Sequence, residues 1–439
     1  MSSPATTKAK NATWLVLERG VGVAIGFFVM TLVARHLGPD AFGTYTYLFG
    51  LVTLFTPLAS FGLSEIMMRH VATSPDAAHE MLGAALLIQA FGALIGAALA
   101  VLSVLIFGGP TGVTVLLIAV ASLRLLAQPG EVYNAWFMAR ERMGLVVLPR
   151  MLVALTIAVA TLMLVLRGAE FSAFVSMRTV EGVLLGVVAI VVYAVATGTV
   201  PMPRFDLAHL RPLLREGWPL LLSGFAVIIY MRIDQAMLGH LSTETELGLY
   251  GVAVRVADAA LVVPVALRAS FFASIMRAHS AGPEAFERQS QRLYDVLFVA
   301  GVGTMIVVGF ASYLLFEPIF GADYAMGLPM VLVLLVGLPW VALGSGRGPI
   351  LIAQGWLWTT TATTAMAALV NVGLNFALIP QYGGIGAAAA TVVSYWLAGH
   401  GSSFLFAYLR PTGRAMTRSL NIFGAVSRIL RALKAGDAE

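Results

Sequence analysis

Long apolar stretches, separated by short polar connections, run along the chain from about residue 12 to residue 409. A helix needs roughly 20 mostly apolar residues to cross a membrane. Two stretches, residues 81–123 and 348–409, contain no Asp, Glu, Lys or Arg and are too long for one crossing, so each must fold back on itself. Turn signals rich in Gly and Pro at residues 107–110 and 379–384 mark where each one folds back.

The pattern predicts an all-α integral membrane protein with about twelve transmembrane helices and no folded domain outside the bilayer. The longest connections, residues 199–216 and 276–291, are too short for such a domain. Residues 344–348 are glycine-rich and are expected to form the turn between the tenth and eleventh helices. The expected helices lie at 12–35, 41–66, 80–107, 113–139, 144–167, 171–198, 217–240, 247–275, 292–316, 325–346, 355–379 and 384–409.

A local pattern recurs about 205 residues apart, which predicts two six-helix lobes related by an internal repeat. Residues 37–45 resemble residues 238–250, and each segment precedes a helix with a mid-span proline, Pro57 or Pro264. Internal repeats are common in secondary transporters, where the substrate path lies at the repeat interface. The expected divisions are an N-lobe at 1–198, a cytoplasmic linker at 199–216, a C-lobe at 217–409 and a basic amphipathic cytoplasmic tail at 410–439.

Composition excludes the soluble classes of protein. Hydrophobic residues make up 59% of the 439 and charged residues only 11%, against roughly 25% charged in an ordinary soluble protein. Such a chain lacks the charged surface that a soluble enzyme or a nucleic-acid-binding domain needs. The net charge of +5 therefore does not indicate nucleic acid, and the absence of cysteine excludes disulfides and thiol chemistry.

The positions of Lys and Arg predict the orientation of the chain. With the N-terminus inside, eighteen of the 27 Lys and Arg residues fall on the inner side and only Arg35 and Arg167 on the outer side. Cytoplasmic loops of membrane proteins carry this excess of basic residues. Both termini are therefore expected in the cytoplasm.

The basic tail has a helical pattern of its own. A helix there places Ile422, Val426, Ile429, Leu430 and Leu433 on one side, and most of the arginines on the other. This pattern is typical of an amphipathic helix on the anionic inner leaflet. The alternative is a frayed basic tail that only obeys the charge rule of the inner side.

Several expected helices carry charged side chains, which cost several kcal/mol at the bilayer centre unless they face a polar cavity or a partner. Arginine suits phosphate, because its planar fork offers bidentate hydrogen bonds and stays charged when partly desolvated. The charges therefore favour a water-filled cationic cavity for an anionic substrate. Its candidate binding residues are Arg19, Arg124, Arg232 and Arg255.

Structural pairing is the alternative for these charges. Arg178 and Glu181, and likewise Arg255 and Asp258, are one helical turn apart and suited to pair on one helix face. Buried carboxylates also bind a coupling proton or sodium ion in some transporters. The candidates for ion coupling or charge pairing are Glu18, Glu65, Glu131, Asp234 and Asp258.

Cofactor chemistry has no support in the sequence. The seven His residues are scattered without metal-ligand spacing. No G-x-x-x-x-G-K-S/T motif is present, so this chain is not expected to hydrolyse ATP. We therefore expect no metal and no cofactor, with a proton or sodium gradient as the open source of energy.

Several segments resemble one family in the expected order. Residues 33–45 read VARHLGPDAFGTY, and residues 232–253 contain RIDQAMLG followed by ELGLYGVA. Further on, FGADY stands at 320–324, and NVGLNFALIP followed by GGIGAA at 371–388. Together these segments resemble the Wzx-type polysaccharide-biosynthesis flippases of the MOP superfamily, which includes the MATE transporters.

This resemblance implies a MOP/MATE-like fold and a flippase that is not an enzyme. The implied substrate is an undecaprenyl-pyrophosphate-linked oligosaccharide repeat unit, moved from the cytoplasmic to the outer leaflet by alternating access. The related lipid II flippases have an acid beside an Arg on the first helix and an Arg on the eighth, and Glu18, Arg19 and Arg255 sit at similar places. Implied partners are membrane lipids, a polysaccharide polymerase and other assembly proteins, with no nucleic acid.

Two rival functions remain open. A MATE-type multidrug antiporter would favour acidic residues over arginine in its cavity, because its substrates are often cations. A membrane glycosyltransferase, polymerase or ligase acting on the same lipid carrier would present its catalytic groups on a sizeable outer loop. The outer connections are all short, and no catalytic constellation is recognisable in them.

Overall fold

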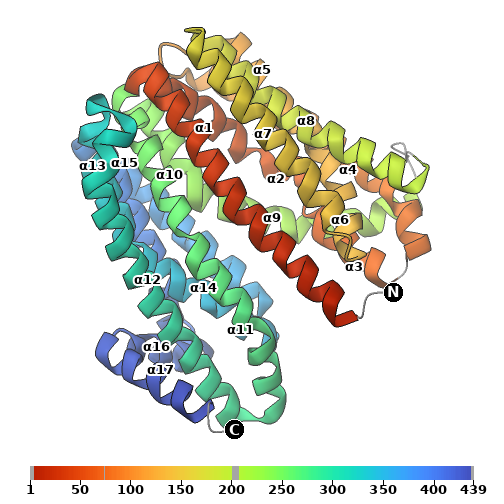
Figure 1. Ribbon diagram of the computed structural model, residues 1–439, viewed down its shortest axis with the longest axis vertical. Helices are drawn as coiled ribbons and strands as arrows, with labels where there is room; N and C mark the ends of the chain where they lie inside the picture. The colour runs from red at the N-terminus through yellow and green to blue at the C-terminus, as the bar shows by residue number, and fades with distance from the viewer. Residues whose placement is uncertain (1–3, 74, 200–206, 437–439) are drawn as a thin grey trace. The chain divides into compact units, whose positions relative to one another are not determined.

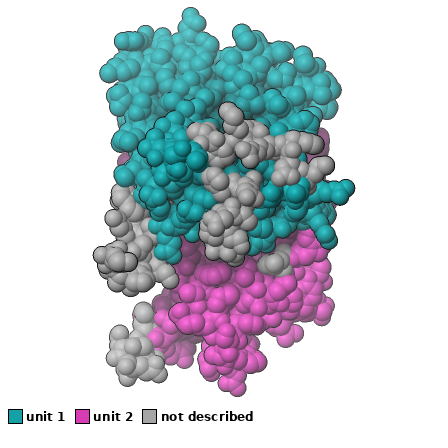
Figure 2. All heavy atoms as spheres, turned by 90° about the vertical axis from the view of Figure 1, so that its right-hand side faces the viewer, with its two compact units in different colours: residues 1–240 teal, residues 241–439 magenta. Residues whose placement is uncertain are grey.

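The computed structural model describes residues 4–73, 75–199 and 207–436, and all secondary structure in these residues is helical (Figure 1). The chain divides into two compact units, residues 1–240 and 241–439 (Figure 2). The predicted fold class, an all-α membrane protein, is thus confirmed.

The first unit consists of helices that run in sequence from the N-terminus. They are α1 (Pro4–Leu54), α2 (Thr56–Ser60), α3 (Leu63–Thr73), α4 (Pro75–Phe107), α5 (Val115–Ser122), the 3-10 helix η1 (Leu123–Gly130), α6 (Glu131–Ala139), α7 (Gly144–Leu166), α8 (Phe171–Thr197) and α9 (Leu207–Leu241), which ends one residue into the second unit.

The second unit follows the same style of long helices joined by short turns. Its helices are α10 (Glu244–Ala260), α11 (Val262–Ala281), α12 (Pro283–Phe320), η2 (Ala322–Gly327), α13 (Leu328–Val336), α14 (Leu338–Ala353), α15 (Leu357–Gly399), η3 (Gly401–Phe404), η4 (Ala407–Leu409), α16 (Arg410–Ser419) and α17 (Ile422–Gly436).

Ten helical stretches in the described residues are long and apolar enough to span a membrane. Two of them, Gly20–Leu54 and Trp358–Phe404, contain 35 and 47 residues, whereas roughly 20 suffice for one crossing. The backbone leaves helical geometry inside both, at Gly38 with φ of 73° and at Gly383 with φ of 54°. A left-handed φ is easily adopted only by glycine, so both breaks are encoded locally.

The expected uninterrupted helix at 41–66 is wrong in detail, because the helix breaks twice there. It stops at Leu54, resumes as α2 with Pro57 near its start, and turns at Phe61, whose φ is 50°. Gln89 of α4 donates a hydrogen bond of 2.9 Å to the carbonyl of Ser60, which precedes this turn. A buried side chain from the neighbouring helix thus replaces a lost backbone partner.

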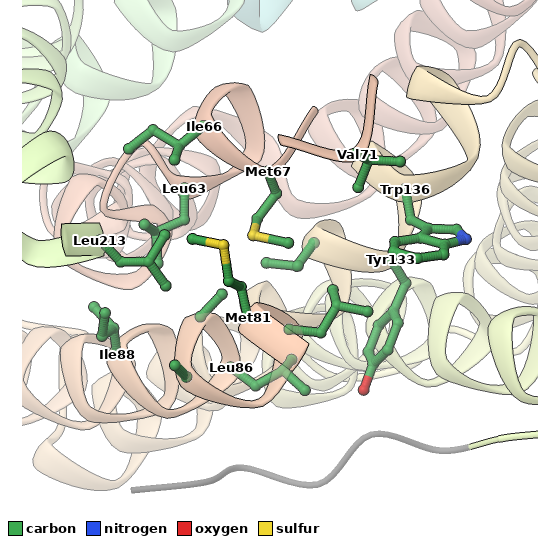
Figure 3. Packing of buried hydrophobic residues seen from close by; sticks show 14 of the residues in the cluster. Leu63, Ile66, Met67, Val71, Met81, Leu86, Ile88, Tyr133, Trp136 and Leu213 are labelled. Atoms are coloured by element: carbon green, nitrogen blue, oxygen red, sulfur yellow. The ribbon is translucent and has the colours of Figure 1, made fainter. Parts of the chain in front are cut away.

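The core of the first unit forms where α3, α4 and α6 pack together, and α9 contributes to it (Figure 3). Leu63 and Met67 are fully buried beside Met81, and Trp136 and Tyr133 close one end of the cluster. The leucines Leu210 and Leu213 place α9 in this same core. The seventh expected helix, which lies in α9, therefore belongs to the first compact unit by its packing. The division into two lobes of six helices each stays a prediction.

The core of the second unit lies where α11, α12, α14 and α16 pack together, around Leu293, Leu297, Leu343 and Met416. The expected turn at 344–348 is wrong, because these residues continue α14 to Ala353. The three glycines there favour a turn in isolation, but they also permit close packing. A Cβ at Gly344 would lie 2.8 Å from the Cα of Gly399. Tertiary packing therefore outweighs the local preference.

Candidate functional site

The fourth expected span is not a regular helix, and its irregular part carries two of the candidate charges. Between α5 and α6 the chain tightens into η1, which contains Pro129. Arg124 is its second residue, and Glu131 follows directly after it. Proline lacks the backbone donor of a regular turn, and 3-10 segments inside longer helices often mark functional sites.

A close approach of α8 fixes the position of η1. Gly182 and Gly186 of α8 are four residues apart, the spacing that lets two membrane helices approach at backbone distance. A Cβ at Gly186 would lie 2.4 Å from the carbonyl oxygen of Ala127, and one at Gly182 would lie 2.8 Å from the Cβ of Arg124. The two glycines therefore place the backbone that carries Arg124.

Arg124 itself is half-buried, and its guanidinium carbon lies 5.9 Å from the ring centroid of Phe49 on α1. This distance permits a cation–π contact, which stabilises a partly desolvated guanidinium. Arg124 thus connects α1, η1 and α8 inside the first unit. The sequence could indicate the charge in the span, but not the aromatic ring beside it.

Glu131 pairs with Arg150 of α7, with the Nη2 to Oε2 distance at 2.5 Å and both side chains about one third exposed. A second pair lies on α8, where Arg178 pairs with Glu181, as their spacing of one helical turn predicts. Glu131 is therefore placed for charge pairing. The sequence does not predict its partner, because no spacing rule connects residues on different helices.

The Glu131–Arg150 pair should be energetically coupled. Glu131→Ala and Arg150→Ala are each expected to lower the melting temperature of the purified protein, because each leaves one charge without its partner. The double variant should lose less than the sum of the two, with a coupling of about 1 kcal/mol. Thermal unfolding of the four proteins in one detergent measures this, and strictly additive losses would contradict the pairing.

On α9 the two candidate charges lie two residues apart but differ in burial. Asp234 is only 2% exposed and accepts a hydrogen bond of 2.8 Å from the backbone N–H of Gln235. Arg232 is half-buried. The Oε1 atom of Gln235 lies 3.0 Å from where a Cβ on Gly50 of α1 would stand, so α9 and α1 pack closely at this level.

Glu65 does not lie within a buried charge cluster. It is exposed and stands in the first turn of α3, directly after the break at Phe61. A carboxylate is favourable there because the N-terminus of a helix carries partial positive charge. The structure therefore gives Glu65 a local role at a helix start.

In the second unit, Arg255 and Asp258 lie one turn apart near the end of α10. Arg255 is exposed and Asp258 is half-buried. The helix is interrupted just after them at Leu261, before α11 begins with Pro264 near its start. Arg255 therefore stands near the interruption of a membrane helix and does not fill a core.

One buried arginine was not among the candidates. Arg347 of α14 is 4% exposed and donates hydrogen bonds of 2.8 Å to Ser402 and 2.7 Å to Thr363. It joins α14 to α15 and η3 with charge-assisted hydrogen bonds, which are the strong ones in proteins. The glycines around it suggested a loop, so the role of Arg347 in joining these helices was not predicted.

The remaining candidates are Glu18 and Arg19. Both fall within α1, but their side chains lie outside the part of the chain whose side chains the structure describes. The structure thus places Arg124, Arg232 and Asp234 in the first unit, and Arg255 and Asp258 in the second. Among the described residues, no group of three or more His, Asp or Glu could hold a metal ion.

These features define a multi-pass helical membrane protein, and solved structures share the fold. The lipid II flippase MurJ in an inward closed conformation matches with a TM-score of 0.70 at 15% identity, over 96% of each chain. An inward-facing multidrug resistance MATE transporter of the MOP superfamily matches with a TM-score of 0.64 at 16% identity, over 90% of this chain and 96% of that chain.

The model of the polysaccharide biosynthesis protein family matches residues 9–272, so the chain belongs to this family. It is also similar to the probable low-salt glycan biosynthesis flippase of Haloferax volcanii, with 22% identity over 409 residues that cover 88% of this chain and 81% of the relative. The resemblance to this family is therefore confirmed, and two of the segments that indicated it, residues 33–45 and 232–253, lie inside the matched range. The family is one of transporters rather than of enzymes.

Proposed function

We propose that this protein is a flippase that moves undecaprenyl-pyrophosphate-linked oligosaccharide repeat units from the cytoplasmic to the outer leaflet of a bacterial cytoplasmic membrane. The observation that carries this proposal is the arginine set on apolar spans, Arg124, Arg232 and Arg255, in a chain that belongs to the polysaccharide biosynthesis family. Guanidinium groups suit pyrophosphate, because they bind its oxygens bidentately and stay charged when desolvated.

The proposed topology has twelve crossings with both termini in the cytoplasm. The breaks at Gly38 and Gly383 each divide one long apolar stretch into two, which supports twelve crossings from ten stretches. Helix interruptions beside Pro57 and Pro264 stand at matching points of the repeat, which supports two related lobes. The excess of Lys and Arg on one side supports the orientation.

In the proposed mechanism Arg19, Arg124, Arg232 and Arg255 bind the pyrophosphate and neighbouring sugar groups in a cationic cavity. The lipid tail stays in the bilayer, and the two lobes alternate in opening toward each side. Arg124 lies within the 3-10 helix η1, and Arg255 lies in the second half of α10, which is interrupted at Leu261; a change in backbone geometry there would move these side chains. Asp234 and Asp258 are the proposed acids for a coupling proton or sodium ion, because both are at least half-buried.

A MATE-type drug antiporter is the second candidate function, since a MATE transporter matches the fold with a TM-score of 0.64. The buried carboxylate of Asp234 suits that function better than the arginines do. A cationic drug would be repelled by Arg124 and Arg255, so the balance of charges favours the lipid-linked glycan.

Deletion of the gene in the cells that make this protein tests the proposal. We expect loss of a surface polysaccharide, with complete repeat units accumulating on undecaprenyl pyrophosphate, as measured by mass spectrometry of extracted lipids. Truncated repeat units would instead indicate a missing transferase. An unchanged lipid pool with altered drug sensitivity would support the antiporter.

A further inference from the structure

The last two helices, α16 and α17, are docked on α12 rather than frayed from it (Figure 1). Asp295 of α12 is 1% exposed and accepts two hydrogen bonds of 2.7 Å from the guanidinium of Arg428 on α17. Ser419 at the end of α16 donates a third, of 2.8 Å, to the same carboxylate. One buried carboxylate thus holds both helices, and its hydrogen bonds raise the pKa of Arg428.

Further contacts fix α16 along its length. Gln291 of α12 donates to the carbonyl of Ala415 and to Ser419, at 3.1 Å and 3.0 Å. His400 lies 2.9 Å from the hydroxyl of Thr417, and Met416 is fully buried in the second core. These contacts fix the orientation of α17, and they therefore determine which of its faces is exposed.

The outward face of α17 is apolar. Ala425 is fully buried, and Arg428 and Ile429 are half-buried and line the same pocket as Asp295 of α12. Phe423, Val426 and Leu430 are 86%, 38% and 53% exposed. Their spacing of three and four residues aligns them on one side of the helix. We call these three residues the apolar ridge.

Charge decides which partner the apolar ridge fits. In the sequence, residues 410–439 contain six basic residues and two acidic ones, Asp437 and Glu439, at the end. Arg431 and Lys434 are exposed and flank the ridge on α17, and Arg414 is exposed on α16. Apolar side chains bordered by an excess of basic ones match an anionic lipid surface, which attracts each Lys or Arg by about 1 kcal/mol.

We propose that the apolar ridge inserts into the headgroup region of an anionic phospholipid leaflet, so that α17 is a membrane-binding surface clamped to α12 through Asp295. This proposal uses the orientation given under the proposed function, which makes this leaflet the cytoplasmic one. It adds that α12, one of the long spans of the second unit, is tied to the leaflet at one end. Lipid charge then stabilises the docked tail.

The absence of cysteine from the chain makes a direct test possible. Phe423→Cys and Leu430→Cys are labelled with an environment-sensitive nitrobenzoxadiazole dye and reconstituted in nanodiscs of phosphatidylcholine, with or without phosphatidylglycerol. We expect label emission to rise roughly twofold or more and shift to the blue with phosphatidylglycerol, because the dye enters an apolar layer. Glu287→Cys, exposed on α12, is the control and should not change.

A second variant separates lipid binding from folding. Arg431→Glu combined with Lys434→Glu changes only exposed charges and should abolish the response of the label at position 423 to phosphatidylglycerol. Emission typical of water in both lipids would overturn the proposal, and so would protection of the label in cells but not in nanodiscs, which would indicate a protein partner. Since the readout needs no transport, failure of the proposed flippase activity would leave this result unaffected.

Discussion

Replacing Arg255 with alanine is expected to reduce export of the lipid-linked oligosaccharide roughly tenfold or more, while the protein remains in the membrane at its normal level. A hydrogen bond to a charged group contributes about 1.5–3 kcal/mol, and about 1.4 kcal/mol corresponds to a factor of ten. Because Arg255 is exposed on α10, its removal leaves no cavity in a core. The loss should therefore appear in transport and not in stability.

The conservative variant and a matched control sharpen this prediction. Arg255→Lys should retain part of the activity, because lysine keeps the charge but lacks the bidentate fork. Arg288→Ala removes an exposed arginine whose pairing with Glu284, at 3.7 Å, is also exposed. Exposed pairs contribute little, so this control should export normally. Normal export by Arg255→Ala at normal expression would remove Arg255 from the site.

Replacing Gly186 with leucine should cost the most in stability of the changes considered. A Cβ at this position would lie 2.4 Å from a backbone oxygen of η1, and a backbone oxygen cannot move aside as a flexible side chain can. Overpacking of this kind costs roughly 1–3 kcal/mol or more. We expect a lower yield of folded protein and a lower melting temperature by size-exclusion chromatography after heating.

The control for this change is Gly303→Leu. Gly303 is exposed on α12, and a Cβ there meets nothing within 4 Å. Leucine also has the higher helix propensity, so this variant should be at least as stable as the parent. Equal tolerance of leucine at both positions would contradict the close contact of α8 with η1.

The hydrophobic pattern could predict where the helices run, because apolar length alone decides which segments cross a membrane. The expected turn at 107–110 coincides with the end of α4 at Phe107. Irregularities inside spans were not predictable. The turn at Phe61 is held by Gln89 of another helix, and the helical course of residues 344–348 depends on packing against Gly399. Both are tertiary effects without a local signal.

The same limit applies to the candidate site residues: contacts within one helix could be predicted, and contacts between helices could not. Pairing of Arg178 with Glu181 follows from spacing on one helix, whereas pairing of Glu131 with Arg150 joins two helices. Arg428 counted as a residue of the polar face of the tail, but a buried carboxylate on α12 turns it inward. Residue type and position within a span therefore indicate which charges are costly to place in the bilayer. Which of them pair depends on their neighbours in the folded structure.

The most direct measurement is transport by the purified protein. Proteoliposomes would carry an undecaprenyl-pyrophosphate-linked saccharide with a nitrobenzoxadiazole label, and dithionite added outside would bleach only the label in the outer leaflet. The proposed function predicts that the protein exposes the inner-leaflet pool to dithionite and that Arg255→Ala does so much more slowly. Bleaching confined to the outer leaflet, as in protein-free liposomes, in the presence of ion gradients of either direction would contradict the flippase.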